Sequence, residues 1–182
     1  MFTIILPENY TTTAWKNGGG VTHEIAKLEE NGQWLWRLSI AEVSTNGPFS
    51  RFEGLSRILT VIEGAGLLLN LPDAVLKALP FHPIAFSGDT TLDSQMIDGP
   101  IKDLNLIYDA SKFRAQVEVL DGPCRHGAGV GQVGVLCLSG VVQVDGKPVP
   151  RMGFAFGDTG EFVLAIGAKC AVIRLQNRSQ TA

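Results

Sequence analysis

The side chains best placed to do chemistry lie in one stretch, residues 15–41. It begins with a glycine loop, residues 17–20, whose three glycines let the backbone approach a bound molecule closely. Two runs that alternate polar and apolar residues follow, and the polar turn at residues 29–32 separates them. The stretch therefore predicts a loop followed by two neighbouring strands.

The polar residues of these two strands fall on defined faces, because side chains on a strand repeat every two residues. Thr22 and Glu24 share a face of the first strand, and Arg37 and Ser39 share a face of the second. If those faces coincide, an acid, a base and two hydroxyls converge beside the glycine loop. The alternative, which the pattern alone favours, is the solvent-facing side of an antiparallel hairpin.

Further polar residues extend this set into a predicted polar lumen. Arg37 and Arg57 each offer a planar fork suited to a carboxylate, and Asp103 falls on the same strand face as Asn105. Such a set would bind a small polar acid. The alternative is that Arg37–Glu24 and Arg57–Asp103 are ion pairs that only fill the barrel mouth. The predicted ligand-binding residues are Asn17, Gly18, Gly20, Thr22, Glu24, Arg37, Ser39, Arg57, Asp103 and Asn105.

The sequence offers little for metal or nucleophilic chemistry. Its three histidines, His23, His82 and His126, are isolated from one another, and His23 falls on the strand face opposite Thr22. No nucleophile elbow is present, and the glycine loop precedes a strand rather than a helix, which disfavours a phosphate site. We therefore expect no metal and no cofactor. Among the tryptophans, Trp15 beside the glycine loop is the one we expect to contact a ligand.

Composition narrows the class of protein. The 182 residues are 45% hydrophobic, which is enough for a sizeable core, and the 21 glycines suit an all-β chain with tight turns. A net charge of −3 without a basic tract disfavours a nucleic-acid partner. The three cysteines suggest no disulfide framework, and neither a leader peptide nor a membrane helix is evident. We expect a cytoplasmic protein, monomeric or homodimeric, without membrane partners.

The chain also repeats itself. A strand, a glycine turn and a second strand around Gly64 recur around Gly140, and the Phe-Ser-Gly-Asp run from Phe86 resembles Phe-Gly-Asp from Phe156. The repeat predicts two related β-modules, arranged either as two small antiparallel barrels or as one large sandwich. The pattern of strands and turns resembles the double-stranded β-helix of cupins. We predict an all-β bicupin of two jelly-roll modules, residues 1–110 carrying the site and residues 111–182.

Two local assignments accompany this prediction. Residues 9–13 are expected to be a polar connection into Trp15. Residues 74–79 suit either a helical turn or a strand.

Two motifs together resemble the HutD/Ves family. They are Trp-Lys-Asn-Gly-Gly-Gly-Val-Thr-x-Glu-Ile from Trp15 and Gly-Pro-Phe-Ser-x-Phe-x-Gly-x-x-Arg from Gly47, and Gly-Pro-x-x-Asp-Leu-Asn from Gly99 also fits. The chain departs from the family at His23, at Glu53 and at residues 55–56, where an acidic residue that could pair with Arg57 is missing.

The resemblance implies a bicupin without the usual metal ligands. It also implies a link to histidine utilisation, through binding an intermediate such as formylglutamate or urocanate. Our leading expectation is a protein that binds a small carboxylate metabolite. The alternatives are an isomerase or lyase without a metal, with Glu24 as general base and Arg37 holding the substrate carboxylate, or an interaction scaffold with no lumen ligand.

Overall fold

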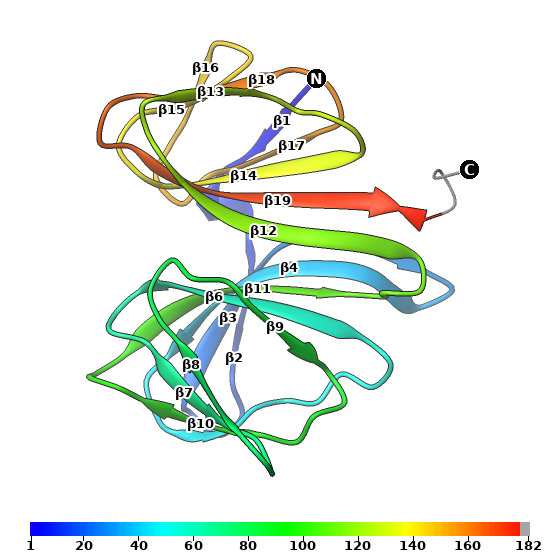
Figure 1. Ribbon diagram of the computed structural model, residues 1–182, viewed down its shortest axis with the longest axis vertical. Coiled ribbons are helices and arrows are strands. Elements are labelled where there is room, and N and C mark those ends of the chain that lie inside the picture. The colour runs from blue at the N-terminus through cyan, green and yellow to red at the C-terminus, as the bar shows by residue number, and fades with distance from the viewer. Residues whose placement is uncertain (179–182) are drawn as a thin grey trace. The chain divides into compact units, whose positions relative to one another are not determined.

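Antiparallel β-sheet makes up almost all the regular structure of residues 1–178, which the computed structural model describes (Figure 1). The chain divides into two compact units. We call Thr11–Ala110 the first barrel, and Met1–Tyr10 together with Ser111–Ala182 the second barrel.

The first ten residues differ from the expected division at residue 110. The first strand, β1 (Thr3–Ile5), pairs antiparallel with β17 (Phe154–Gly157), so that Ile4 lies opposite Ala155. A 3-10 turn, η1 (Pro7–Asn9), follows, and the Tyr10 hydroxyl donates a hydrogen bond to the Met152 carbonyl at 2.6 Å. These contacts tie the N-terminal segment to the second barrel rather than to the module that follows it in sequence.

Each barrel is built on eight consecutive strands. Those of the first barrel are β4 (Gln33–Val43), β5 (Gly47–Pro48), β6 (Ser56–Glu63), β7 (Leu67–Asn70), β8 (Val75–Ala78), β9 (Ile84–Ser87), β10 (Asp93–Met96) and β11 (Ile101–Tyr108), preceded by β2 (Thr11–Ala14) and β3 (Gly20–Glu30). Those of the second barrel are β12 (Phe113–Asp121), β13 (Cys124–Gly127), β14 (Gln132–Ser139), β15 (Val142–Val144), β16 (Lys147–Val149), β17 (Phe154–Gly157), β18 (Glu161–Leu164) and β19 (Lys169–Asn177).

The two sets of eight strands pair in the same order, which explains the repeat in the sequence. In the first barrel the sheets run β2-β3-β4-β11-β6-β9 and β5-β10-β7-β8, and in the second they run β1-β17-β14-β19-β12 and β13-β18-β15-β16. Replacing β4 to β11 by β12 to β19 converts one set of pairings into the other. Two sheets of this connectivity form a jelly roll, so the predicted all-β bicupin fold is confirmed.

The hairpin that carries the predicted site forms as the sequence suggests. β3 and β4 are joined by Asn31 and Gly32, whose φ angles of 52° and 76° are both positive. Such a two-residue turn matches the right-handed twist of its strands, and Asn-Gly is its favoured sequence. Two β-bulges, between Leu28 and Glu29 and between Glu24 and Ala26, then interrupt the ladder, and beyond them Glu24 lies opposite Ser39 and Thr22 opposite Ala41.

The structure corrects one local secondary-structure prediction and decides another. Residues 11–14 form the edge strand β2 instead of a polar connection, because their β-branched threonines pair along β3 and put Thr13 opposite Thr22. The segment that suited either a helical turn or a strand is the strand β8, which pairs with β7.

The two barrels differ in what fills them. The interior of the second barrel is apolar, with Val133, Val135, Phe162 and Val172 among the side chains of its core. The first barrel has an apolar cluster that includes Leu59, Leu67, Leu69 and Ile101. Beside that cluster, however, it also buries charged and amide side chains.

Candidate functional site

Four buried polar residues of the first barrel, Ser39, Arg57, Asp103 and Asn105, lie with the half-buried Arg37 on three adjacent strands in ladder register. The rows across β4, β11 and β6 are Arg37–Ile107–Arg57, Ser39–Asn105–Leu59 and Ala41–Asp103–Val61. Because alternate residues of a strand share a face, the members of these rows lie on one side of the sheet. The rows bring two arginines, an amide, a hydroxyl and a carboxyl to one wall.

This wall lines a pocket of about 460 Å³. The predicted residues that line it are Asn17, Thr22, Arg37, Ser39, Arg57, Asp103 and Asn105. Gly18 and Gly20 instead line a neighbouring pocket of about 390 Å³, and Glu24 lines neither one.

Arg37 is held at the edge of the pocket by an ion pair. Its Nε donates to Glu24 Oε2 at 2.7 Å, and its guanidinium lies 4.8 Å from the centre of the Trp34 ring. Lys27 Nζ lies 3.6 Å from the other oxygen of Glu24. The Arg37–Glu24 ion pair weighed as an alternative is therefore present, and Glu24 serves it rather than facing the pocket.

Arg57 is buried among aromatic rings. Its side chain is 3% exposed, and its guanidinium lies 5.0–5.2 Å from the ring centres of Phe49, Phe52 and Phe86. Its Nη1 donates to the Ser50 carbonyl at 3.0 Å, and its Nε donates to Asn105 Oδ1 at 3.4 Å. Burial lowers the pKa of Arg57 to about 10, which still leaves the group charged at neutral pH.

The Arg57–Asp103 ion pair weighed in the sequence analysis is not formed. Asp103 is 1% exposed, and within residues 1–178 neither of its carboxylate oxygens makes a hydrogen bond. Burial raises the pKa of Asp103 to about 7, although the charge of Arg57 opposes this rise. The pocket thus contains a buried guanidinium without a carboxylate of its own and a buried carboxyl group without a donor.

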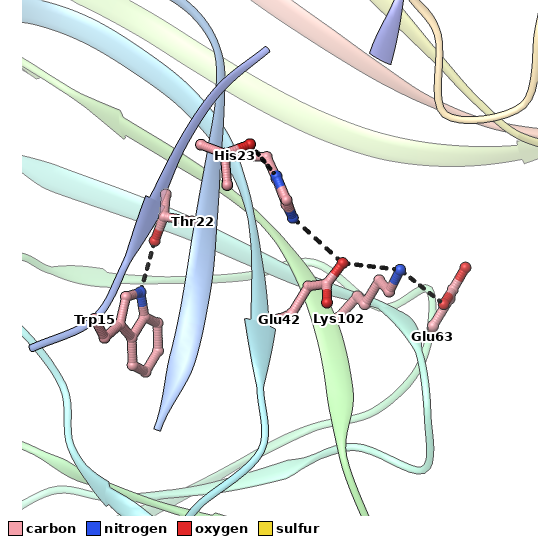
Figure 2. A network of polar contacts seen from close by, with 7 residues as sticks. Trp15, Thr22, His23, Glu42, Glu63 and Lys102 are labelled. Atoms are coloured by element: carbon pink, nitrogen blue, oxygen red, sulfur yellow. Dashed lines mark hydrogen bonds and ion pairs between the residues drawn. The ribbon is translucent and has the colours of Figure 1, made fainter. Parts of the chain in front are cut away.

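The glycine loop reaches this pocket only through Asn17, and it is tightly packed against its neighbours. Trp15 Nε1 donates to Thr22 Oγ1 at 2.8 Å, a contact drawn in Figure 2, and the Gly19 amide donates to Asn17 Oδ1 at 3.0 Å. A Cβ on Gly20 would lie 2.4 Å from the Glu42 carbonyl oxygen and 3.0 Å from the Trp15 ring. Gly20 is therefore required by the approach of Trp15 and β4.

The opposite face of β3 carries a separate polar chain. In Figure 2, Thr22 points toward Trp15 whereas His23 points toward Glu42. His23 Nε2 lies 3.3 Å from Glu42 Oε1, and Lys102 Nζ lies 3.1 Å from the same oxygen and 3.7 Å from Glu63 Oε2. The alternation of β3 thus keeps His23 out of the pocket, as the sequence pattern predicts.

The sequence reasoning missed part of the aromatic wall. Phe49, Ser50 and Phe52 line the pocket with Trp15 and Lys16, yet Trp15 was the one aromatic residue expected to contact a ligand. The available signal was their proximity in sequence to Arg57, since an arginine without an acidic neighbour can be held by aromatic faces.

The other two histidines make local contacts. His82 Nδ1 lies 2.8 Å from the Pro80 carbonyl oxygen, and the His126 ring stacks on Phe162 at 5.4 Å. Within residues 1–178, no three His, Cys, Asp or Glu side chains gather as a metal-binding group. The same part of the chain contains no helix with the length and apolar character needed to cross a membrane.

Comparison with known proteins identifies the family. The sequence pattern of the HutD family matches residues 7–178. The chain belongs to the HutD family. A curated relative from Pseudomonas putida, named as an uncharacterized 21.2 kDa protein in the hutC 3′ region, is 36% identical over 157 residues, which is 82% of each chain. Protein Ves of Escherichia fergusonii is 33% identical over 136 residues, covering 73% of this chain and 71% of its own.

Solved structures agree with the family and the fold. HutD from Pseudomonas fluorescens, determined in a formate condition, superposes with a TM-score of 0.87 at 33% identity, covering 98% of this chain and all of its own. A cupin 2 conserved barrel domain protein from Leptotrichia buccalis superposes with a TM-score of 0.55 at 13% identity, covering 91% of this chain and 96% of its own. At that identity the second likeness shows only the cupin fold.

Proposed function

We propose that the first barrel of this HutD-family protein binds a small carboxylate metabolite in the pocket around Arg57. The observation that carries the proposal is the guanidinium itself, which is buried, charged and without an ion pair within residues 1–178. A buried charge costs stability unless it is compensated. A ligand carboxylate would compensate it with the two parallel hydrogen bonds that arginine favours.

The repeat supplies an internal comparison. With β6 aligned on β14 and the pairings with β11 and β19 kept in register, Arg57 corresponds to Val133, Asp103 to Cys170 and Asn105 to Val172. Val133, Cys170 and Val172 are all fully buried in the apolar core of the second barrel. The jelly roll therefore accepts apolar residues at these places, so its architecture does not demand the polar residues of the first barrel.

The context of the relatives supports a role in histidine utilisation. One relative is named for its place beside hutC, and HutD from Pseudomonas fluorescens was solved in a formate condition. On this proposal the protein binds an acid of that pathway, and it thereby either regulates amino-acid catabolism or scavenges the acid. The isomerase or lyase alternative is less well supported, because its proposed base, Glu24, is engaged by Arg37 and Lys27 outside the pocket lining.

A thermal-shift screen tests the proposal. The compounds are formate, glutamate, formylglutamate, urocanate and histidine, with divalent metals as a separate arm. A ligand at about 100 times its dissociation constant stabilises the folded state by roughly 2.7 kcal/mol, which a melting curve can show. We expect a shift with at least one acid that disappears in Arg57→Gln and persists in the control Arg125→Gln, which removes an exposed arginine of the second barrel.

Each other outcome of the screen contradicts the proposal in a definite way. A shift with metal alone would oppose recognition by Arg57. A shift with an acid that survives in Arg57→Gln would place the ligand elsewhere. No shift from any compound would favour the scaffold alternative.

A further inference from the structure

The inner wall of the pocket presents hydrogen-bond donors to a ligand. Asn105 uses its Oδ1 to accept from Arg57, which leaves its Nδ2 hydrogens to donate. Ser39, paired with Asn105 across the ladder, has a hydroxyl that makes no hydrogen bond within residues 1–178. With the guanidinium of Arg57, these groups form a surface suited to the oxygens of an anion.

Asp103 lies on this donor wall, two residues from Asn105 along β11. As a carboxylate it is an acceptor only, and it would repel a ligand anion held by the same wall. As a protonated acid it becomes one more donor. Its two oxygens make no hydrogen bond within residues 1–178, so no protein contact there fixes the carboxylate form.

A count of the charges around Asp103 favours the protonated acid in the complex. From β6 it faces Arg57, and from β4 the pocket wall contributes Arg37, whose charge is matched by Glu24 on β3. Lys16 lines the pocket from the loop but is itself exposed to solvent, which screens its charge. An ionised Asp103 together with a bound carboxylate would set two buried negative charges against the single guanidinium of Arg57.

The position of the second barrel that corresponds to Asp103 is equally buried, and burial opposes ionisation there too. The residue that corresponds to Asp103 is Cys170, and burial raises the pKa of its thiol to about 12. Asp103 sits in an equally buried place, where burial raises its own pKa to about 7. A further negative charge from a bound acid moves an already raised pKa upward.

From this arrangement, and resting on the proposed function, we propose that Asp103 takes up a proton when the acid binds and donates a hydrogen bond to it. Asp103 is then a specificity-determining residue. It favours a ligand that presents an acceptor oxygen to β11 and disfavours one that presents an ammonium group there. Binding becomes linked to pH, because the binding-competent form of the empty site is the one with a neutral Asp103.

The test is the affinity for formate as a function of pH, followed by amide chemical shifts in an NMR titration. Formate remains ionised from pH 6 to pH 8, so its own charge does not change. With a free-site pKa of about 7, the protonated fraction of Asp103 falls about tenfold over this range. We expect the dissociation constant of the wild type to rise about tenfold from pH 6 to pH 8.

Two variants separate this linkage from a structural role of the carboxyl group. Asp103→Asn keeps a neutral donor in place, so it should bind formate at pH 8 at least as tightly as the wild type and lose the pH dependence. Glu118→Gln, which removes a carboxylate from the second barrel, should retain the wild-type profile. A further comparison uses propionate and β-alanine, which differ by one ammonium group; propionate should bind about tenfold more tightly at pH 6.

The contrary results are distinct. Affinity that does not change with pH in the wild type would show that no proton is taken up on binding, and would overturn the inference. Affinity that increases with pH, or tighter binding of β-alanine than of propionate, would show that Asp103 acts as an ionised acceptor and would overturn it as well. Loss of formate binding in a folded Asp103→Asn protein would do the same. In each of these cases the proposed carboxylate binding by Arg57 would stand. Absence of formate and propionate binding to the wild type at every pH would overturn the inference, and absence of binding by every acid of the thermal-shift screen would overturn the proposed function as well.

Discussion

Replacing Asp103 by asparagine should stabilise the protein at alkaline pH and leave its stability unchanged at acid pH. The ordinary pKa of the aspartate side chain, 3.8, applies to the unfolded chain, and burial raises the pKa to about 7 in the folded state. Between pH 4 and pH 7 the folded state therefore holds a proton that the unfolded state has released. The free energy of unfolding of the wild type consequently falls as pH rises through this window.

The magnitude follows from the difference of about three between the two pKa values. At 1.36 kcal/mol for each pKa unit, the cost of ionising Asp103 in the folded state approaches about 4 kcal/mol above pH 7 and vanishes below pH 4. Asparagine carries no such cost. The stability difference between Asp103→Asn and wild type should thus grow from near zero at pH 4 to at most about 4 kcal/mol at pH 8.

Urea unfolding followed by tryptophan fluorescence at pH 4, 6 and 8 measures this difference. All three tryptophans, Trp15, Trp34 and Trp36, lie in the first barrel, so the signal reports the unit that contains Asp103. A stability difference that does not change with pH, or a wild type that gains on the variant as pH rises, would refute the reasoning. Either result would mean that the carboxyl group is paired or solvated in the folded protein.

Three further substitutions test the site and the packing around it. Arg37→Ala should abolish acid binding in calorimetric titrations while far-UV circular dichroism stays unchanged; unaltered affinity would remove Arg37 from the site. Gly134→Ala should destabilise the second barrel by about 1–3 kcal/mol in urea unfolding followed by circular dichroism, because its Cβ would lie 2.4 Å from the Phe154 ring. Leu69→Ala should cost about 2–5 kcal/mol by tryptophan fluorescence, because its side chain is fully buried in the first barrel, and a loss under 1 kcal/mol would contradict that packing.

Local pattern was sufficient to predict the hairpin of β3 and β4. The alternation of β3 and β4 put Thr22 with Glu24 and Arg37 with Ser39 on shared strand faces, but the pattern alone favoured a solvent-facing side, whereas the structure turns Thr22 and Ser39 into the pocket. The same alternation on β11 placed Asp103 beside Asn105. The repeat around Gly64 and Gly140 was visible because each barrel needs a glycine at the same turn.

Other features depend on long-range contacts that periodicity does not encode. The alternation of a strand gives the face of a side chain but neither its depth nor its partner. An ion pair of Arg57 with Asp103 therefore remained an alternative from the sequence, whereas the structure surrounds Arg57 with phenylalanine rings. The first strand gave no sign that β17, some 150 residues later, was its partner. The edge strand β2 was missed because three threonines suit a polar connection and a strand alike.

A crystal structure of the protein with the acid that gives the largest thermal shift would test the central claim most directly. The account predicts the ligand carboxylate inside the first barrel, with its oxygens about 2.7–2.9 Å from the guanidinium nitrogens of Arg57. An acid bound outside this pocket, or one inside it whose carboxylate points away from Arg57, would contradict the account.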